Sequence, residues 1–145
     1  MVYSQQLASY TVANETVQKT RQLVMLYDAV IRFLKQARVA MEERRFEERM
    51  NLIQKASNII IGLHKSVDFE RGGEIAQTLN NFYIAMDLRM LNLNRSNSLT
   101  ECDGILSEIK MMRDAWDKID NKLNEPIGKA DLPADAEKPV ADFSA

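Results

Sequence analysis

The chain has 145 residues, enough for one domain with its own hydrophobic core, and its 19 basic and 21 acidic residues leave a formal net charge of −2. Basic and acidic residues are mixed along the sequence, so no basic patch that would bind nucleic acid or anionic lipid is indicated. No apolar run reaches the roughly 18 residues that a membrane span needs, so no membrane insertion is expected. A single cysteine excludes an internal disulfide and no signal-peptide pattern is visible, so we expect a cytoplasmic protein with a protein or peptide partner.

The N-terminal segment, residues 1–13, carries isolated apolar side chains, Leu7 and Tyr10 among them, between polar ones. A stretch this short and sparse cannot bury itself, so we expect an arm that docks on the rest of the chain. The first helix then begins at Asn14 or at Thr20, since either side chain can serve as an N-cap.

Four longer segments repeat apolar residues at the three-and-four spacing of an amphipathic helix. They cover about residues 14–41, 46–67, 74–94 and 99–123. The expected connections are the charged run 42–45, the adjacent pair Gly72 and Gly73, and the polar residues 95–98. Ser98 or Thr100 can cap the last helix.

Long amphipathic helices joined by short connections pack as antiparallel neighbours. Residues 14–123 are therefore predicted to form an all-α, antiparallel four-helix bundle. Residues 124–145 contain all three prolines of the chain and few large apolar side chains, so the sequence predicts a disordered tail there.

Residues that could carry enzyme chemistry are few. The only histidine, His64, has no H-x-x-x-H or E-x-x-H companion, so neither a zinc site nor a di-iron site is indicated. Cys102 keeps step with the apolar stripe of the last helix and is expected to behave as a small apolar side chain. Gly72 and Gly73 lack the lysine of a phosphate-binding loop. We therefore predict a protein that is not an enzyme and has no cofactor or metal.

Apolar residues in the first three helices exceed a single inward stripe, and eight methionines add flexible apolar surface. Three pairs lie at the margins of the stripe: Tyr27 and Ile31, Ile59 and Ile61, Phe82 and Met90. If these side chains are exposed, they form a groove for another protein. If they are buried, they are packing.

Several short motifs add a family resemblance. They are L-Y-D at Leu26–Asp28, N-x-x-x-K-A at Asn51–Ala56, G-G-E-I-A-x-x-L-x-x-x-Y at Gly72–Tyr83, and Trp116 near the end of the last helix. In this order and spacing they resemble the FliS family, the cytoplasmic export chaperones of flagellin. Family members usually carry Ser-Pro where this chain has Lys19 and Thr20, so the docking geometry of the arm stays open.

The resemblance implies a four-helix chaperone that binds the disordered C-terminal segment of flagellin, prevents its premature polymerisation in the cytoplasm and delivers it to the export gate of the flagellar export apparatus. We expect the apolar margins of the first three helices to bind flagellin, with the arm covering part of the groove in the free protein. The predicted flagellin-binding residues are Leu7, Tyr10, Tyr27, Ile31, Leu34, Ile53, Ile60, Leu79, Tyr83, Met86 and Met90.

An alternative belongs to another functional class. The same apolar surplus is expected in a structural helical bundle that self-associates as a homodimer and has no client. The sequence alone does not separate a weak homodimer from a flagellin chaperone, because both need exposed apolar residues.

Overall fold

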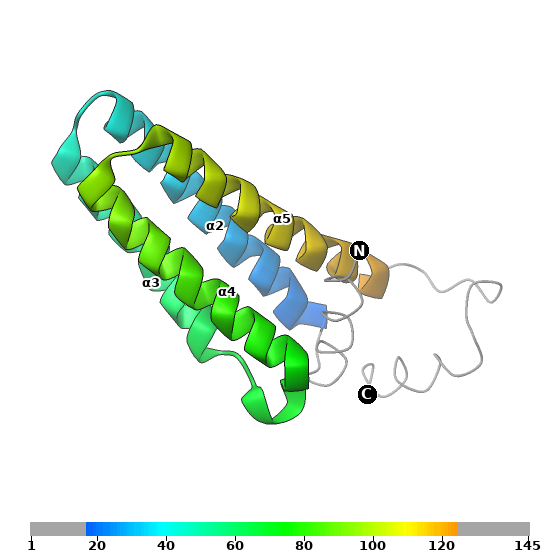
Figure 1. Cartoon of the computed structure of the whole chain (residues 1–145). Helices are drawn as coiled ribbons and strands as arrows, with labels where there is room; N and C mark the ends of the chain where they lie inside the picture. The colour runs from blue at the N-terminus through cyan, green and yellow to red at the C-terminus, as the bar shows by residue number, and fades with distance from the viewer. Residues whose placement is uncertain (1–16, 125–145) are drawn as a thin grey trace, which may run out of the picture.

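The computed structural model describes residues 17–124, which form four long helices: α2 (Val17–Glu42), α3 (Phe46–Lys65), α4 (Phe69–Ser96) and α5 (Leu99–Asn124). Successive helices are antiparallel neighbours, and α5 returns to pack along α2 (Figure 1). The predicted all-α four-helix bundle is confirmed. The predicted arm, and the predicted tail apart from Asn124, lie outside the described residues.

The core is made by one apolar stripe from each helix, whose buried residues recur three or four positions apart. On α5 the stripe is Cys102, Ile105, Ile109, Met112, Trp116 and Ile119. Cys102 is fully buried among these side chains, as expected of a small apolar residue. Burying one large apolar side chain contributes about 1.5–3 kcal/mol, so the four stripes together drive the helices into one bundle.

Residues 43–45 connect α2 to α3, at the place that the charged run predicts. Arg44 has a φ of 57°, a left-handed conformation that residues other than glycine adopt rarely. The Arg45 amide donates to the Ala40 carbonyl at 2.8 Å, and the Arg44 amide donates to the Met41 carbonyl at 3.3 Å. These two bonds form a Schellman cap, which satisfies the last carbonyls of α2 and turns the chain back.

The connection between α3 and α4 begins at residues 66–68, ahead of the predicted glycine pair, and the backbone breaks a second time at Gly73, so the prediction located only the second part of the turn. Asp68 caps α4, and its carboxylate accepts hydrogen bonds from the amides of Glu70 and Arg71, both at 3.1 Å. Gly73 still interrupts the helix, because its φ of 55° and ψ of −128° are not helical. The glycine therefore makes a kink one turn after the reversal.

The connection between α4 and α5 is tied to the start of α3 and the end of α2, which lie at the same end of the bundle (Figure 1). Asn97 ends α4 with a φ of 49°. The Ser98 hydroxyl, one of the two predicted caps, accepts from a main-chain amide in the first turn of α5 at 3.1 Å. The Arg49 guanidinium donates to Asn97 Oδ1 at 3.1 Å, and Asn97 Nδ2 donates to the Met41 carbonyl at 3.3 Å. One end of all four helices is thus held by a single polar cluster.

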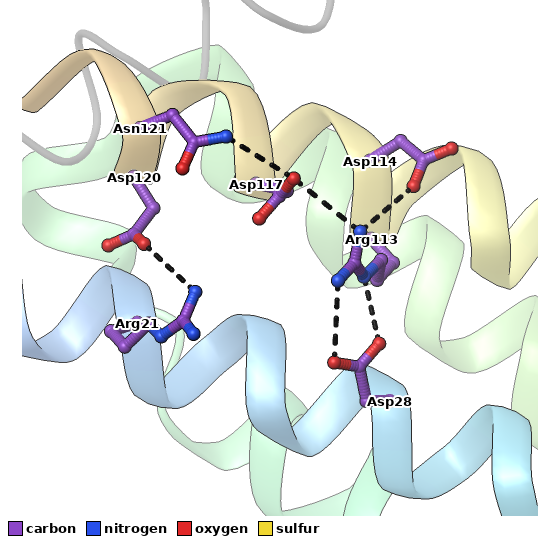
Figure 2. Close-up of polar contacts among 7 residues, drawn as sticks. All are labelled: Arg21, Asp28, Arg113, Asp114, Asp117, Asp120 and Asn121. Atoms are coloured by element: carbon purple, nitrogen blue, oxygen red, sulfur yellow. Dashed lines mark hydrogen bonds and ion pairs between the residues drawn. The ribbon is translucent and has the colours of Figure 1, made fainter.

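Within residues 17–124, ion pairs cross from α2 to α5 at matching heights. They include Arg21–Asp120, Asp28–Arg113 and Arg38–Asp103, and Figure 2 shows the first two. Seven residues separate the first pair from the second on both helices, and ten separate the second pair from the third. Equal spacing on both helices means that each pair forms in the same antiparallel register.

Candidate client-binding surface

Most of the predicted flagellin-binding residues lie in the core. Eight of them have an exposed fraction of 2% or less: Tyr27, Leu34, Ile53, Ile60, Leu79, Tyr83, Met86 and Met90. Ile31 is half-buried, and Leu7 and Tyr10 lie outside the described residues. Side chains this deeply buried pack the bundle, so direct contact between them and a client stays a prediction.

Tyr27 and Tyr83 show why two aromatic residues that looked like groove residues are packed inside. Their hydroxyl oxygens are 2.6 Å apart, so each phenol brings its polar group to a hydrogen bond within the core. Burial, followed by the neighbouring phenol of Tyr83, raises the pKa of Tyr27 well above its ordinary value of 10. Tyr27 therefore stays neutral near pH 7, and its hydrogen bond with Tyr83 joins α2 to α4 through the centre of the bundle.

The exposed large apolar side chains of the described residues gather most densely on α3 and α4. We define the α3–α4 surface as Met50, Ile61, Ile84, Leu88 and Leu91, whose exposed fractions range from 37% at Ile61 to 62% at Leu88. Ile84, Leu88 and Leu91 follow one another four and three residues apart, so they form a second apolar stripe on the outer side of α4. Folding leaves this stripe in contact with water.

Two hydrogen bonds between α3 and α4 show how this surface is assembled. The Ser57 hydroxyl donates to Asp87 Oδ1, and His64 Nε2 lies 2.5 Å from Asn80 Oδ1. On each helix the exposed isoleucine of the surface falls between the two bonded residues, about one turn from each. The isoleucines of α3 and α4 therefore lie at the same level along the helix pair.

The opposite seam of the bundle, between α2 and α5, has a different character. Figure 2 shows Arg113 of α5 directed at Asp28 of α2, with Asp114 and Asp117 close to the same guanidinium. Charged residues on this seam are paired with one another, so they already have partners within the chain. The α3–α4 surface lacks such ion pairs among the described residues and offers mainly apolar contact.

The single cysteine, Cys102, is fully buried in the apolar stripe of α5. Burial raises the pKa of the Cys102 thiol to about 11, with the Asp103 carboxylate adding to this effect and Arg38 opposing it. Among residues 17–124 no three His, Cys, Asp or Glu side chains gather to hold a metal ion. None of the described helices is long and apolar enough to cross a membrane.

Part of this surface escaped the sequence-based prediction. Ile84, Leu88 and Leu91 were overlooked because the stronger stripe of Met86 and Met90 occupies the same segment of α4. The sequence does contain a sign of this surface: a second series of apolar residues on the same helix, displaced from the first and with its own three-and-four spacing. Ile61 was recognised at a margin, and its exposure places it at the surface.

Comparison with known proteins relates this bundle to flagellar assembly. Residues 3–123 match the family model of flagellar protein FliS. The chain is 29% identical over 106 residues to the flagellar secretion chaperone FliS of Campylobacter jejuni, an alignment that covers 72% of this chain and 80% of that protein. It is 36% identical over 99 residues to the flagellar secretion chaperone FliSB of Pseudomonas aeruginosa, covering 68% and 79% of the two chains.

A third relative gives the same result. The chain is 36% identical over 104 residues to the flagellar secretion chaperone FliS of Salmonella typhimurium, covering 69% of this chain and 75% of that protein. The family model spans most of the four-helix bundle described above, together with residues that precede it. The chain therefore belongs to the flagellar protein FliS family, whose named relatives are flagellar secretion chaperones.

Proposed function

We propose that this chain is a cytoplasmic chaperone that binds the disordered C-terminal segment of flagellin, prevents its premature polymerisation and delivers it to the flagellar export apparatus. Membership of the FliS family makes flagellar export the setting. The observation that carries the proposal is the apolar α3–α4 surface, because exposed apolar side chains gathered on one helix pair are typical of a protein-binding site.

The chemistry of the proposed client fits this surface. A disordered segment that becomes helical on binding exposes an apolar stripe, and laying that stripe along a helix pair removes both apolar surfaces from water. Exposed residues on α4 at Ile84, Leu88 and Leu91 have the spacing that meets a second helix lying alongside. The surface therefore suits an amphipathic helix better than an extended strand, which would need a free sheet edge.

Energetics favour a reversible complex. Ordering a disordered client costs about 2–5 kcal/mol or more of the gross interaction energy, so part of the apolar contact is offset by lost chain entropy. The complex can then be specific without being permanent, and release at the export apparatus requires no nucleotide hydrolysis by the chaperone. Capture of the C-terminal segment also withholds it from other flagellin molecules, which prevents polymerisation.

Titration of the full chain with the C-terminal segment of flagellin from the same organism tests the proposal. We expect saturable one-to-one binding in calorimetry and a gain of helical circular dichroism beyond the sum of the separate components. Absence of binding at about tens of micromolar would reject the proposed function. An unrelated amphipathic peptide of equal length serves as the control for non-specific apolar adsorption.

Sedimentation of the purified chain addresses self-association. The proposal expects a monomer, or a dimer that the flagellin segment dissociates, because client and partner copy would compete for the same apolar residues. A stable dimer that persists in excess flagellin segment would instead favour the structural bundle without a client.

A further inference from the structure

One charged group lies within the otherwise apolar α3–α4 surface. Asp87 is half-buried on α4, three residues after Ile84 and four residues before Leu91, so it shares a side of the helix with both. Leu88 follows it directly on the outer stripe. A helix that covers the three apolar side chains therefore also covers the Asp87 carboxylate.

The partners of Asp87 distinguish it from other carboxylates that bridge helices. Its Oδ1 accepts a hydrogen bond from the Ser57 hydroxyl, a neutral donor on α3. Asp28 and Asp103, which cross between α2 and α5, are each paired with an arginine. Among the described residues no lysine, arginine or histidine forms an ion pair with Asp87, so the described bundle supplies no cation to neutralise its charge.

Covering this carboxylate with an apolar client would remove water from a charge that has no cationic partner. Desolvation of an unpaired charge opposes binding strongly, whereas a cation that arrives with the client compensates for the lost water. Charge complementarity inside a desolvated apolar contact gives specificity more than raw affinity. The surface therefore selects among amphipathic helices rather than accepting any of them.

We propose that Asp87 is a specificity-determining residue of the α3–α4 surface and that it pairs with a lysine or arginine placed within the apolar stripe of the client helix. This inference rests on the proposed function, since it names the chemistry of the segment that the surface binds. The occupant is a client helix whose apolar positions are interrupted by one cation, and a wholly apolar stripe would bind less well.

Two variants of Asp87 separate this role from a purely apolar one. Asp87→Asn keeps an acceptor for Ser57 and removes the charge, and we expect it to weaken binding of the C-terminal flagellin segment at least tenfold. Asp87→Leu extends the apolar surface, yet we expect it to weaken binding by a similar factor. Asp114→Asn, an equal loss of charge on the exposed side of α5, should change affinity less than twofold. Thermal melts and circular dichroism of each variant verify the fold.

Substitutions in the client identify the partner group. Each lysine and arginine of the flagellin segment is replaced in turn by methionine, and one replacement should weaken binding to the unaltered chaperone but have no further effect on Asp87→Asn. Unchanged affinity for folded Asp87→Asn, tighter binding by Asp87→Leu, or additive effects at every client cation would each overturn the inference. If the unaltered chaperone itself binds no flagellin segment, the proposed function fails first, and the two failures are thereby distinguished.

Discussion

Arg113 on α5 meets both carboxylate oxygens of Asp28 on α2, with Nε 2.8 Å from Oδ1 and Nη2 3.4 Å from Oδ2. The hydrogen bond to Asp28 raises the pKa of Arg113. Sliding α5 by one heptad along α2 would bring Arg113 opposite Arg21, or bring Asp120 opposite Asp28. The ion pairs therefore disfavour the two nearest alternative registers of this helix pair, because each would juxtapose like charges.

Coupling between these two residues can be measured by a double-mutant cycle of Asp28→Asn and Arg113→Gln. Both side chains are partly exposed, so we expect a coupling of about 0.5–1 kcal/mol in urea unfolding at low salt. The coupling should shrink at about 1 M salt, where exposed charges are screened. Strictly additive effects at low salt would show that the pair contributes nothing to stability.

Tyr27 and Tyr83 make a second testable pair. Tyr27→Phe or Tyr83→Phe removes one partner of a hydrogen bond in the core, and each should lower the free energy of unfolding by about 1–2 kcal/mol. The double variant should cost about 1 kcal/mol less than the sum, since neither hydroxyl is then left facing a missing partner. Equality of the double effect and the sum, measured by chemical denaturation, would contradict this coupling.

Alkaline pH should destabilise the bundle through two buried acids. The pKa of Tyr27 is raised well above 10 and that of Cys102 is raised to about 11. Because the folded values exceed the unfolded ones, the stabilisation is complete below about pH 9 and is lost as pH rises toward the folded pKa values. The free energy of unfolding, measured from about pH 8 to pH 11, should fall as pH rises. The free energy of unfolding of the Cys102→Ala variant should fall less steeply over the same range. Identical slopes for Cys102→Ala and the unaltered chain would refute the assignment.

Replacing Gly73 or Gly62 by alanine should change the stability of the bundle in opposite directions. A Cβ at either position meets no atom within 4 Å, but only Gly73 has a positive φ, of 55°. Gly73→Ala should destabilise the bundle by about 1–2 kcal/mol because of backbone strain, whereas Gly62→Ala in a helix interior should stabilise it by about 0.5–1 kcal/mol. Melting temperatures would reveal this difference in sign. A stabilising Gly73→Ala would mean that the kink is not required.

The sequence predicted the helices well because their apolar periodicity is long and uninterrupted. It placed the reversal between α3 and α4 at Gly72 and Gly73, whereas the connection already begins at residues 66–68, where Asp68 caps α4, and breaks again at Gly73. A pair of glycines is a strong local indication of a turn, whereas an aspartate that caps a helix is a weaker one, so the prediction followed the glycines. Both belong to the same region: Asp68 starts α4, and Gly73 bends it one turn later.

Assignment of core and surface was the part that periodicity could not supply. Tyr83 and Leu88 both fit an apolar spacing on α4, yet one is buried and the other is largely exposed. Which of two offset stripes faces inward depends on the rotation of the helix, and that rotation is set by partners on α3 and on α2, such as Ser57 and Tyr27. These contacts join residues far apart in the chain, so a local pattern does not contain them.

The role of the α3–α4 surface in client binding is tested most directly by comparing Leu88→Ser with Met111→Ser. The two side chains have nearly equal exposed fractions, 62% and 60%, but only Leu88 belongs to the α3–α4 surface. We expect Leu88→Ser to weaken binding of the C-terminal flagellin segment about tenfold or more, and Met111→Ser to change it by less than about twofold. Equal affinities of the two folded variants for that segment would contradict the assignment of the α3–α4 surface as the flagellin-binding site.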